Sequence, residues 1–135
     1  MKLNERNKFL YNSLLFLTIL LIDQISKYYA THNILEVCNK GIAFGLGNDG
    51  LLFSILALVA ILWLVVLEKN KRSKLLLVII FGAGCSNLLD RVFYGCVRDF
   101  INIGIFPTFN FADLVITVGV ILFLINIVRK NTNGA

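Results

Sequence analysis

Long apolar runs separated by short polar segments dominate the chain. Four of these runs predict membrane-spanning helices, because about 20 residues of α-helix cross the roughly 30 Å hydrocarbon core of a bilayer. We expect the spans at about residues 9–29, 51–67, 75–93 and 109–128. The second run is the shortest and lies near the lower limit for a span.

The composition agrees with a membrane protein. Of the 135 residues, 58% are hydrophobic and 16% are charged, whereas soluble domains are about 45–50% apolar and about 25% charged. No linker, low-complexity tract or proline- and glycine-rich run divides the chain. We therefore predict an all-α integral membrane protein with one membrane-embedded domain over residues 1–135.

The basic residues predict the orientation. With four spans, both termini and the connection between the second and third spans lie on one side of the membrane. That side carries nine of the thirteen Lys and Arg residues: Lys2, Arg6, Lys8, Lys69, Lys71, Arg72, Lys74, Arg129 and Lys130. Basic loops stay in the cytoplasm, so we expect both termini there. The net charge of +5 then reflects topology rather than a nucleic-acid-binding surface.

Carboxylates lie at the ends of the apolar runs. Asp23 closes the first run, Asp90 closes the third and Asp113 opens the fourth, while Asp99 lies in the segment between the last two. A charged side chain at mid-membrane costs roughly 2.5–3.5 kcal/mol, so several such residues indicate a functional site.

Two N-x-x-D sequences predict that polar groups converge near the outer membrane surface. Asn87–Asp90 ends the third run, and Asn110–Asp113 begins the fourth. Residues i and i+3 share a helix face, so each sequence places an amide beside a carboxylate. Asp23 and Lys27, spaced i and i+4, lie at the same level on the first helix.

The residue types at this level favour carboxylate chemistry. His32 is the only histidine and no H-E-x-x-H sequence occurs, so we expect neither a metal site nor a Ser-His-Asp triad. Ser26 and Lys27 point about 100° apart on a helix, which disfavours a Ser-Lys pair. Two aspartates that share one proton can activate water and protonate a leaving amine. Asp99 and Asp113 are the candidates.

Five sequence blocks carry a resemblance to a known family. They are Asp23-Q-I-S-Lys27, Asn39-K-G-I-A-Phe44-Gly45, Asn87-L-L-Asp90-Arg91, Gly95-C-V-R-Asp99-Phe100 and Phe109-Asn110-F-Ala112-Asp113. In order and spacing they resemble lipoprotein signal peptidase, the bacterial type II signal peptidase, and the likeness covers nearly the whole chain. It implies an intramembrane aspartic endopeptidase that removes signal peptides from prolipoproteins by cleaving just before a diacylglyceryl-modified cysteine.

The resemblance also implies roles for individual residues. Asp99 and Asp113 match the catalytic pair that activates water. Other polar positions match residues that shape the site and hold the substrate backbone: Asn39, Asn87, Asp90, Arg91 and Asn110. Asp23 and Lys27 match a supporting pair on the first helix.

Two residues depart from the family pattern. Ser86 stands where glycine is usual, and it is small enough to keep close helix packing. Arg98 stands where an apolar residue is common. We expect Arg98 either to lower the pKa of Asp99 by attraction or to point towards lipid headgroups.

The family implies a setting for this chemistry. We expect a multi-pass protein of the bacterial cytoplasmic membrane, with its active site near the extracytoplasmic face. Its partners are the lipidated prolipoprotein and membrane lipid, and it works as a monomer with no metal, cofactor or nucleic acid. Segments 30–50 and 94–106 can pair to form a small extracytoplasmic β-rich cover, in which apolar residues touch lipid or acyl chains: Ile42, Phe44 and Leu46.

Several alternatives stay open. A small proton- or cation-coupled transporter would use Asp23 as its one essential acid, and a non-catalytic membrane subunit would need no carboxylate pair. Asp23 and Lys27 could form an ion pair on the helix surface, and Asp90 and Arg91 a structural pair.

The cysteines are expected to be free thiols. Cys85 lies within the third span, whereas Cys38 and Cys96 both lie outside the membrane and could in principle pair. The sequence does not show how far apart these two residues are.

Overall fold

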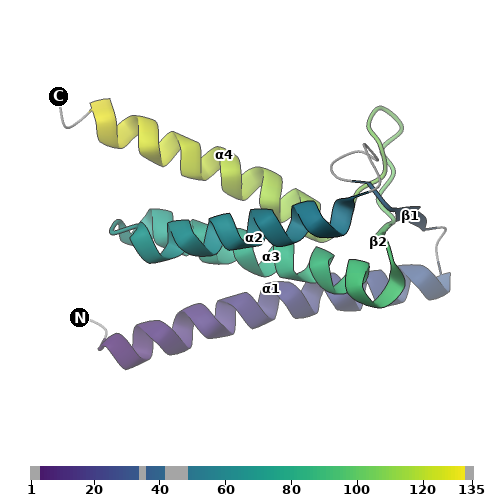
Figure 1. Cartoon of the computed structure of the whole chain (residues 1–135), viewed down its shortest axis with the longest axis horizontal. Coiled ribbons are helices and arrows are strands. Elements are labelled where there is room, and N and C mark those ends of the chain that lie inside the picture. The colour runs from purple at the N-terminus through teal and green to yellow at the C-terminus, as the bar shows by residue number, and fades with distance from the viewer. Residues whose placement is uncertain (1–3, 34–35, 42–48, 133–135) are drawn as a thin grey trace.

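A computed structural model describes residues 4–33, 36–41 and 49–132. Four helices run side by side, with both termini at one end of the bundle and a small sheet at the other end (Figure 1). The elements are, in chain order, α1 (Glu5–Asn33), β1 (Val37–Asn39), α2 (Gly50–Leu67), α3 (Lys71–Tyr94), β2 (Val97–Asp99) and α4 (Phe111–Thr132).

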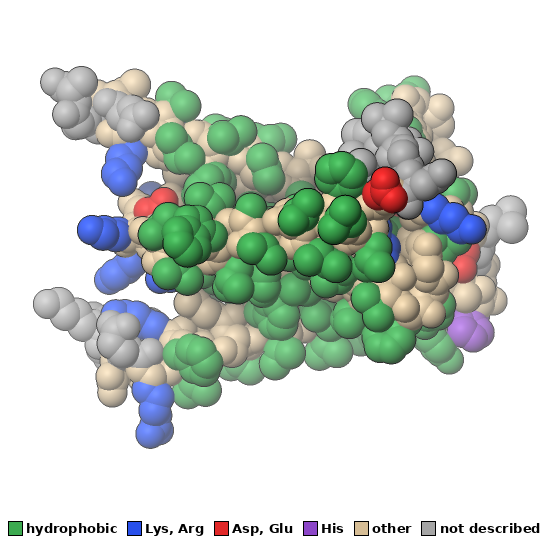
Figure 2. Space-filling model, viewed as in Figure 1, with side chains coloured by type: hydrophobic (Ala, Val, Ile, Leu, Met, Phe, Trp, Pro, Cys, Tyr) green, Lys and Arg blue, Asp and Glu red, His purple; other side chains and the backbone are tan. Residues whose placement is uncertain are grey.

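Helix α3 is the centre of the bundle. It packs against α1, α2 and α4, and it contributes more buried residues than any other helix. All four helices are long and apolar enough to cross a membrane. Large apolar side chains cover the middle of the molecule, and Lys and Arg side chains gather at the end that carries the termini (Figure 2). This is the arrangement of a multi-pass membrane protein.

The helix ends differ from the predicted spans because capping residues set them. Helix α3 starts before the apolar run, since the side chain of Asn70 accepts hydrogen bonds from the backbone N–H groups of Arg72 (2.9 Å) and Ser73 (3.1 Å). It ends at Gly95, which has a φ of 73° and serves as a left-handed C-cap. Helix α4 begins at Phe111, directly after Asn110, whose side chain accepts a hydrogen bond from the backbone N–H of Asp113 (2.9 Å).

The expected β-rich cover contains one short antiparallel sheet. Strand β1 pairs with β2 in the register Val37↔Asp99, Cys38↔Arg98 and Asn39↔Val97. This register brings Asn39 to the end of the bundle that also holds Asp99. The apolar residues expected in the cover lie outside the described residues: Ile42, Phe44 and Leu46.

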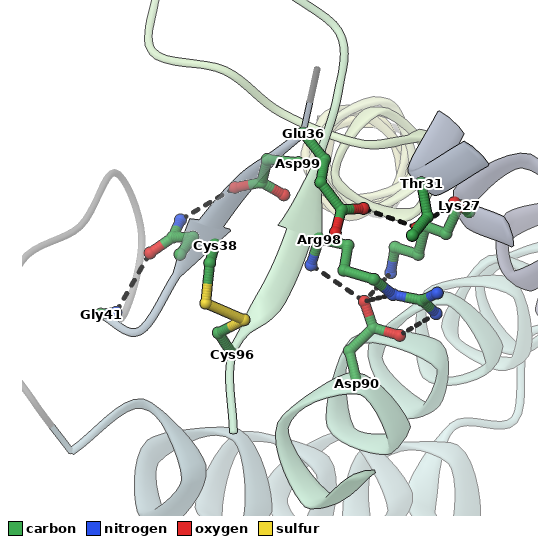
Figure 3. Close-up of a disulfide and its surroundings, with 10 residues drawn as sticks. Lys27, Thr31, Glu36, Cys38, Gly41, Asp90, Cys96, Arg98 and Asp99 are labelled. Atoms are coloured by element: carbon green, nitrogen blue, oxygen red, sulfur yellow. Dashed lines mark hydrogen bonds and ion pairs between the residues drawn. A yellow bond between two sulfur atoms is a disulfide. The ribbon is translucent and has the colours of Figure 1, made fainter. Parts of the chain in front are cut away.

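A disulfide joins Cys38 to Cys96, so the expectation of free thiols was wrong for these two residues (Figure 3). Their Cα atoms are 5.4 Å apart. They meet because β1 folds back onto the chain that leaves α3, a tertiary contact between residues 58 positions apart in the sequence. Cys85, within α3, is a free thiol.

The disulfide predicts how many thiols react. In denatured protein prepared without reductant, we expect a maleimide mass tag to modify one cysteine, and to modify three after reduction. In the Cys85→Ser variant, the tag should modify no cysteine before reduction and two cysteines after it. Three tags on the unreduced wild-type protein would show that the bridge does not form.

Candidate active site

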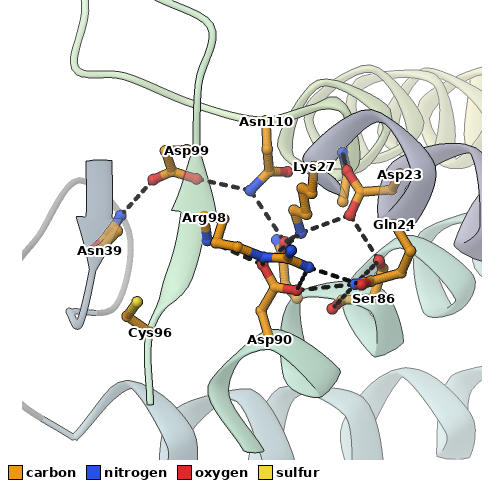
Figure 4. Close-up of polar contacts among 12 residues, drawn as sticks. Asp23, Gln24, Lys27, Asn39, Ser86, Asp90, Cys96, Arg98, Asp99 and Asn110 are labelled. Carbon is orange, nitrogen blue, oxygen red and sulfur yellow. Dashed lines mark hydrogen bonds and ion pairs between the residues drawn. The ribbon is translucent and has the colours of Figure 1, made fainter. Parts of the chain in front are cut away.

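Four charged side chains meet inside the bundle at the end opposite the termini (Figure 4). The Nζ atom of Lys27 lies 2.6 Å from Asp23 and 3.2 Å from Asp90, and Arg98 Nη2 lies 2.8 Å from Asp90 Oδ1. Asp23, Lys27 and Asp90 are 0% exposed, and Arg98 is 5% exposed. We call Asp23, Lys27, Asp90 and Arg98 the buried charge cluster. Its two carboxylates balance its two cations.

The cluster decides three questions that the sequence left open. Asp23 and Lys27 form their ion pair inside the protein and not on the helix surface. Asp90 pairs with Lys27 and Arg98 instead of Arg91. Arg98 therefore points neither to lipid headgroups nor to Asp99.

Asp23 also fixes the start of helix α4. Its Oδ1 accepts a hydrogen bond from the backbone N–H of Ala112 (2.8 Å), and its Oδ2 accepts one from Ser86 Oγ (2.6 Å). Unpaired N–H groups and the helix dipole make a helix N-terminus favourable for an anion. The carboxylate on α1 thereby holds the first turn of α4 against α1 and α3.

Asp113 is held by a capping box at the same helix start. Its backbone N–H donates to Asn110 Oδ1 (2.9 Å), and the N–H of Asn110 donates to Asp113 Oδ2 (3.2 Å). This reciprocal arrangement satisfies two backbone donors and fixes both side chains. The remaining oxygen of Asp113 accepts a hydrogen bond from Asn87 Nδ2 (2.8 Å).

Asn110 links Asp113 to the second candidate carboxylate, Asp99. The Nδ2 of Asn110 donates to Asp99 Oδ1 (2.7 Å), and Asn39 Nδ2 donates to Asp99 Oδ2 (3.0 Å). Asn87 accepts from both Asn110 (3.1 Å) and Lys27 (2.8 Å). The amides therefore fix the position of Asp99 on β2 relative to the start of α4.

Burial changes the acidity of Asp99. The residue is 1% exposed, and this burial raises its pKa to about 6. The negative charge of Asp113 raises the pKa further, while hydrogen bonds from Asn39 and Asn110 oppose the shift. Burial alone would lower the pKa of Arg98, but its hydrogen bond and ion pair with Asp90 raise it. Asp99 can thus carry a proton near neutral pH, while Arg98 keeps its charge.

A cavity of about 500 Å³ opens beside Asp113. Its walls are mostly apolar and are formed by Asn39, Arg91, Val97, Ile103, Phe106, Pro107, Thr108, Phe109, Asp113, Leu114, Ile116 and Thr117. Arg91 Nη2 donates to the carbonyl of Gly41 (2.8 Å). Its buried Nε has no hydrogen-bond partner in the part of the chain that the structure describes.

Close packing holds the backbone beside Arg91. A Cβ atom at Gly50 would lie 2.7 Å from the carbonyl oxygens of Lys40 and Gly41, and 2.9 Å from Arg91 Nε. Only glycine allows the start of α2 to approach this backbone so closely.

The structure brings most of the predicted site residues together and reveals one that was missed. Asn39, Asn87 and Asn110 bond to the candidate pair, whereas Asp90 bonds to none of these residues and belongs to the buried charge cluster. The missed residue is Gln24. It donates to Ser86 and to Asp90 Oδ1 (3.0 Å), and accepts from Arg98 (2.9 Å). Its i, i+3 spacing to Lys27, which places the two side chains on one helix face, was the available signal.

The described residues offer no obvious metal site. Within 4–33, 36–41 and 49–132, no group of three or more His, Cys, Asp or Glu side chains is placed to hold a metal ion. The carboxylates of the site are instead satisfied by amides, backbone N–H groups, Lys27 and Arg98.

Comparisons with known proteins agree with this fold. Two solved structures described as bacterial membrane enzymes share the fold. One has a TM-score of 0.79 and 25% identity, covering 93% of this chain and 92% of that one. The other has a TM-score of 0.75 and 26% identity, covering 87% and 92%. Fold and site thus define a membrane-embedded enzyme with four spanning helices.

The family is shown by sequence. Residues 15–129 match the signal peptidase (SPase) II family. The chain is 37% identical to the lipoprotein signal peptidase of Anaplasma phagocytophilum, over 84% of this chain and 89% of the relative. It is 38% identical to that of Syntrophomonas wolfei, over 82% and 87%. The chain belongs to the signal peptidase II family and is a peptidase, which argues against the transporter and non-catalytic alternatives.

The buried charge cluster predicts a large effect of removing Lys27. In Lys27→Met, two buried carboxylates lose a cation, and breaking a buried ion pair by removing one partner costs about 3–5 kcal/mol. We expect the free energy of unfolding in detergent to fall by about that amount. The control Lys71→Met removes an exposed lysine and should change it by less than about 0.5 kcal/mol. Equal effects of the two substitutions would contradict the proposed importance of the cluster.

Proposed function

We propose that the protein removes signal peptides from prolipoproteins whose cysteine carries a diacylglyceryl group, cleaving just before that cysteine. Family membership supports the removal of a signal peptide, and the relatives above are named lipoprotein signal peptidases. The apolar cavity beside Asp113 supports a substrate that approaches from within the membrane.

We propose Asp99 and Asp113 as the catalytic pair. The single observation that carries this proposal is that Asn110 bonds to both carboxylates while Asp113 lines the cavity. Two nearby carboxyl groups in a low-dielectric site readily share one proton, because their negative charges repel. The raised pKa of Asp99 is consistent with such sharing.

The pair can perform hydrolysis without a covalent intermediate. The ionised carboxylate takes a proton from water, and the water oxygen attacks the carbonyl carbon of the scissile peptide. The protonated carboxyl gives its proton to the carbonyl oxygen, which forms a neutral tetrahedral diol. Collapse of the diol breaks the C–N bond: one carboxyl group protonates the leaving nitrogen, the other takes the hydroxyl proton, and the pair again holds one proton.

The remaining polar residues divide between three roles. We propose that Asn39 and Arg91, which line the cavity, hold the substrate backbone. Asn87 and Asn110 orient the catalytic carboxylates. Because Asp90 lies in the buried charge cluster, we propose that it supports the site, together with Asp23 and Lys27, and does not touch substrate.

The charge distribution and the disulfide support one orientation. Basic side chains gather at the end with the termini (Figure 2), and such residues stay cytoplasmic. The disulfide lies at the opposite end (Figures 1 and 3), and disulfides persist in oxidising compartments. We therefore propose that the enzyme lies in the bacterial inner membrane, with its site at the extracytoplasmic face and lipid around it. We also propose that it acts as a monomer.

Amide substitutions test the catalytic pair. We expect Asp99→Asn and Asp113→Asn each to lower cleavage of a diacylglyceryl-modified prolipoprotein by about 10²–10⁴-fold, because an amide cannot accept and return the proton. Asp49→Asn removes an exposed carboxylate outside the site and should leave the rate unchanged. Normal cleavage by either folded site variant would refute the assignment.

The pH dependence tests the shared proton. As pH rises through the pKa of Asp99, about 6, the pair loses its last proton, so kcat/KM should fall on the alkaline side. Asn39→Ala removes a hydrogen bond that stabilises ionised Asp99. It should therefore raise this pKa and move the alkaline limb to higher pH, whatever its effect on the maximum rate. A limb that stays in place or moves to lower pH would count against a role for Asp99.

A further inference from the structure

Arg98 departs from the family pattern directly beside Asp99, yet its side chain points the other way. Strand β2 places successive side chains on opposite faces. Asp99 faces Asn39 and Asn110, and Arg98 faces the last turns of α3 (Figures 3 and 4). The catalytic function proposed above leaves Arg98 without a role.

One carboxylate holds both the backbone and the side chain of Arg98. Asp90 Oδ2 accepts from the backbone N–H of Arg98 (3.0 Å) and from its Nε (3.3 Å), and Asp90 Oδ1 accepts from its Nη2 (2.8 Å). A bidentate arginine–carboxylate contact fixes orientation as well as distance. The added backbone bond attaches the strand itself to α3.

Two further contacts lock the guanidinium group. Its Nη2 also donates to Gln24 Oε1 on α1 (2.9 Å), and its central carbon lies 4.2 Å from the centre of the Tyr94 ring. Arg98 is thereby held by residues of α1 and α3 at once. These contacts leave β2 little freedom to slide along or tilt away from the bundle.

We propose that Arg98 is a positioning residue, which with Asp90 clamps β2 to α3 and so holds Asp99 at its hydrogen-bonding distance from Asn110. This inference rests on the proposed catalytic role of Asp99. The effect is positional, because Arg98 faces away from Asp99. The causes that set the pKa of Asp99 are burial, Asn39, Asp113, Asn110 and Lys27.

The test measures kcat, KM and the pH profile of lipidated prolipoprotein cleavage per folded enzyme. Arg98→Met keeps an unbranched apolar side chain but removes the guanidinium contacts to Asp90, Gln24 and Tyr94, and leaves only the backbone bond to Asp90. A misplacement of about 1 Å can cost about a hundredfold in rate, so we expect kcat to fall about 10- to 100-fold. KM should stay within about twofold, since Arg98 does not line the cavity. Arg129→Met, an exposed arginine at the other end, is the matched control and should behave as wild type.

Two further variants separate position from charge and from folding. Arg98→Lys keeps the charge but cannot form the bidentate contact, so it should recover only part of the lost kcat. Asp90→Asn combined with Arg98→Met leaves no unpaired charge, which protects folding if the single variant is unstable. We expect its kcat to stay reduced as well, because the guanidinium contacts of Arg98 are still missing.

The outcomes distinguish this inference from the proposed function. Three results would overturn the positioning role. Folded Arg98→Met could have an unchanged kcat, or the double variant could recover the wild-type kcat in full. Alternatively, Arg98→Met could move the alkaline limb of the pH profile to higher pH while it keeps the maximum rate. Asp99→Asn is measured in the same assay. If Asp99→Asn still cleaves, the proposed catalytic function fails; if it is inactive while Arg98→Met is normal, only the positioning role fails.

Discussion

Charges buried away from water must be neutralised, and this requirement organises the end of the bundle that carries the site. A single ion in a low-dielectric interior costs several kcal/mol, which its partners must offset. Lys27 lies between Asp23 and Asp90, and Arg98 completes the balance. Because these four residues come from α1, α3 and β2, satisfying their charges also brings those elements together. Asp23 extends the effect to α4 through its bond to the helix N-terminus.

The two candidate catalytic carboxylates differ from the cluster in their partners. Asp23 and Asp90 each contact a cation directly. The direct hydrogen bonds to Asp99 come from the amides of Asn39 and Asn110, and neutral donors compensate burial less than a cation does. Its pKa therefore rises to about 6. The neutral cluster provides rigid support, and the raised pKa of Asp99 beside it suits the proton transfer that we propose for the pair.

The sequence could predict those features that depend on local periodicity. Apolar runs identified the four helices, and the spacing of Asn110 and Asp113 placed an amide beside a carboxylate at a helix start. It could not predict contacts between distant strands, so the pairing of Cys38 with Cys96 was missed. The partner of Asp90 was also missed, because Arg91 is adjacent in sequence whereas Arg98 reaches Asp90 only after the chain turns at the end of α3.

The two departures from the family pattern meet at one side chain. Ser86 donates to Asp23 and accepts from Gln24 Nε2 (2.9 Å), while Arg98 donates to the Oε1 of the same glutamine (2.9 Å). A glutamine amide has one donor end and one acceptor end, so these contacts fix a single orientation of Gln24. With glycine at 86 and an apolar residue at 98, Gln24 would lose a partner at each end. Ser86 and Arg98 are thus parts of one hydrogen-bond network. The orientation of the Gln24 amide that Ser86 favours is the same orientation that Arg98 favours.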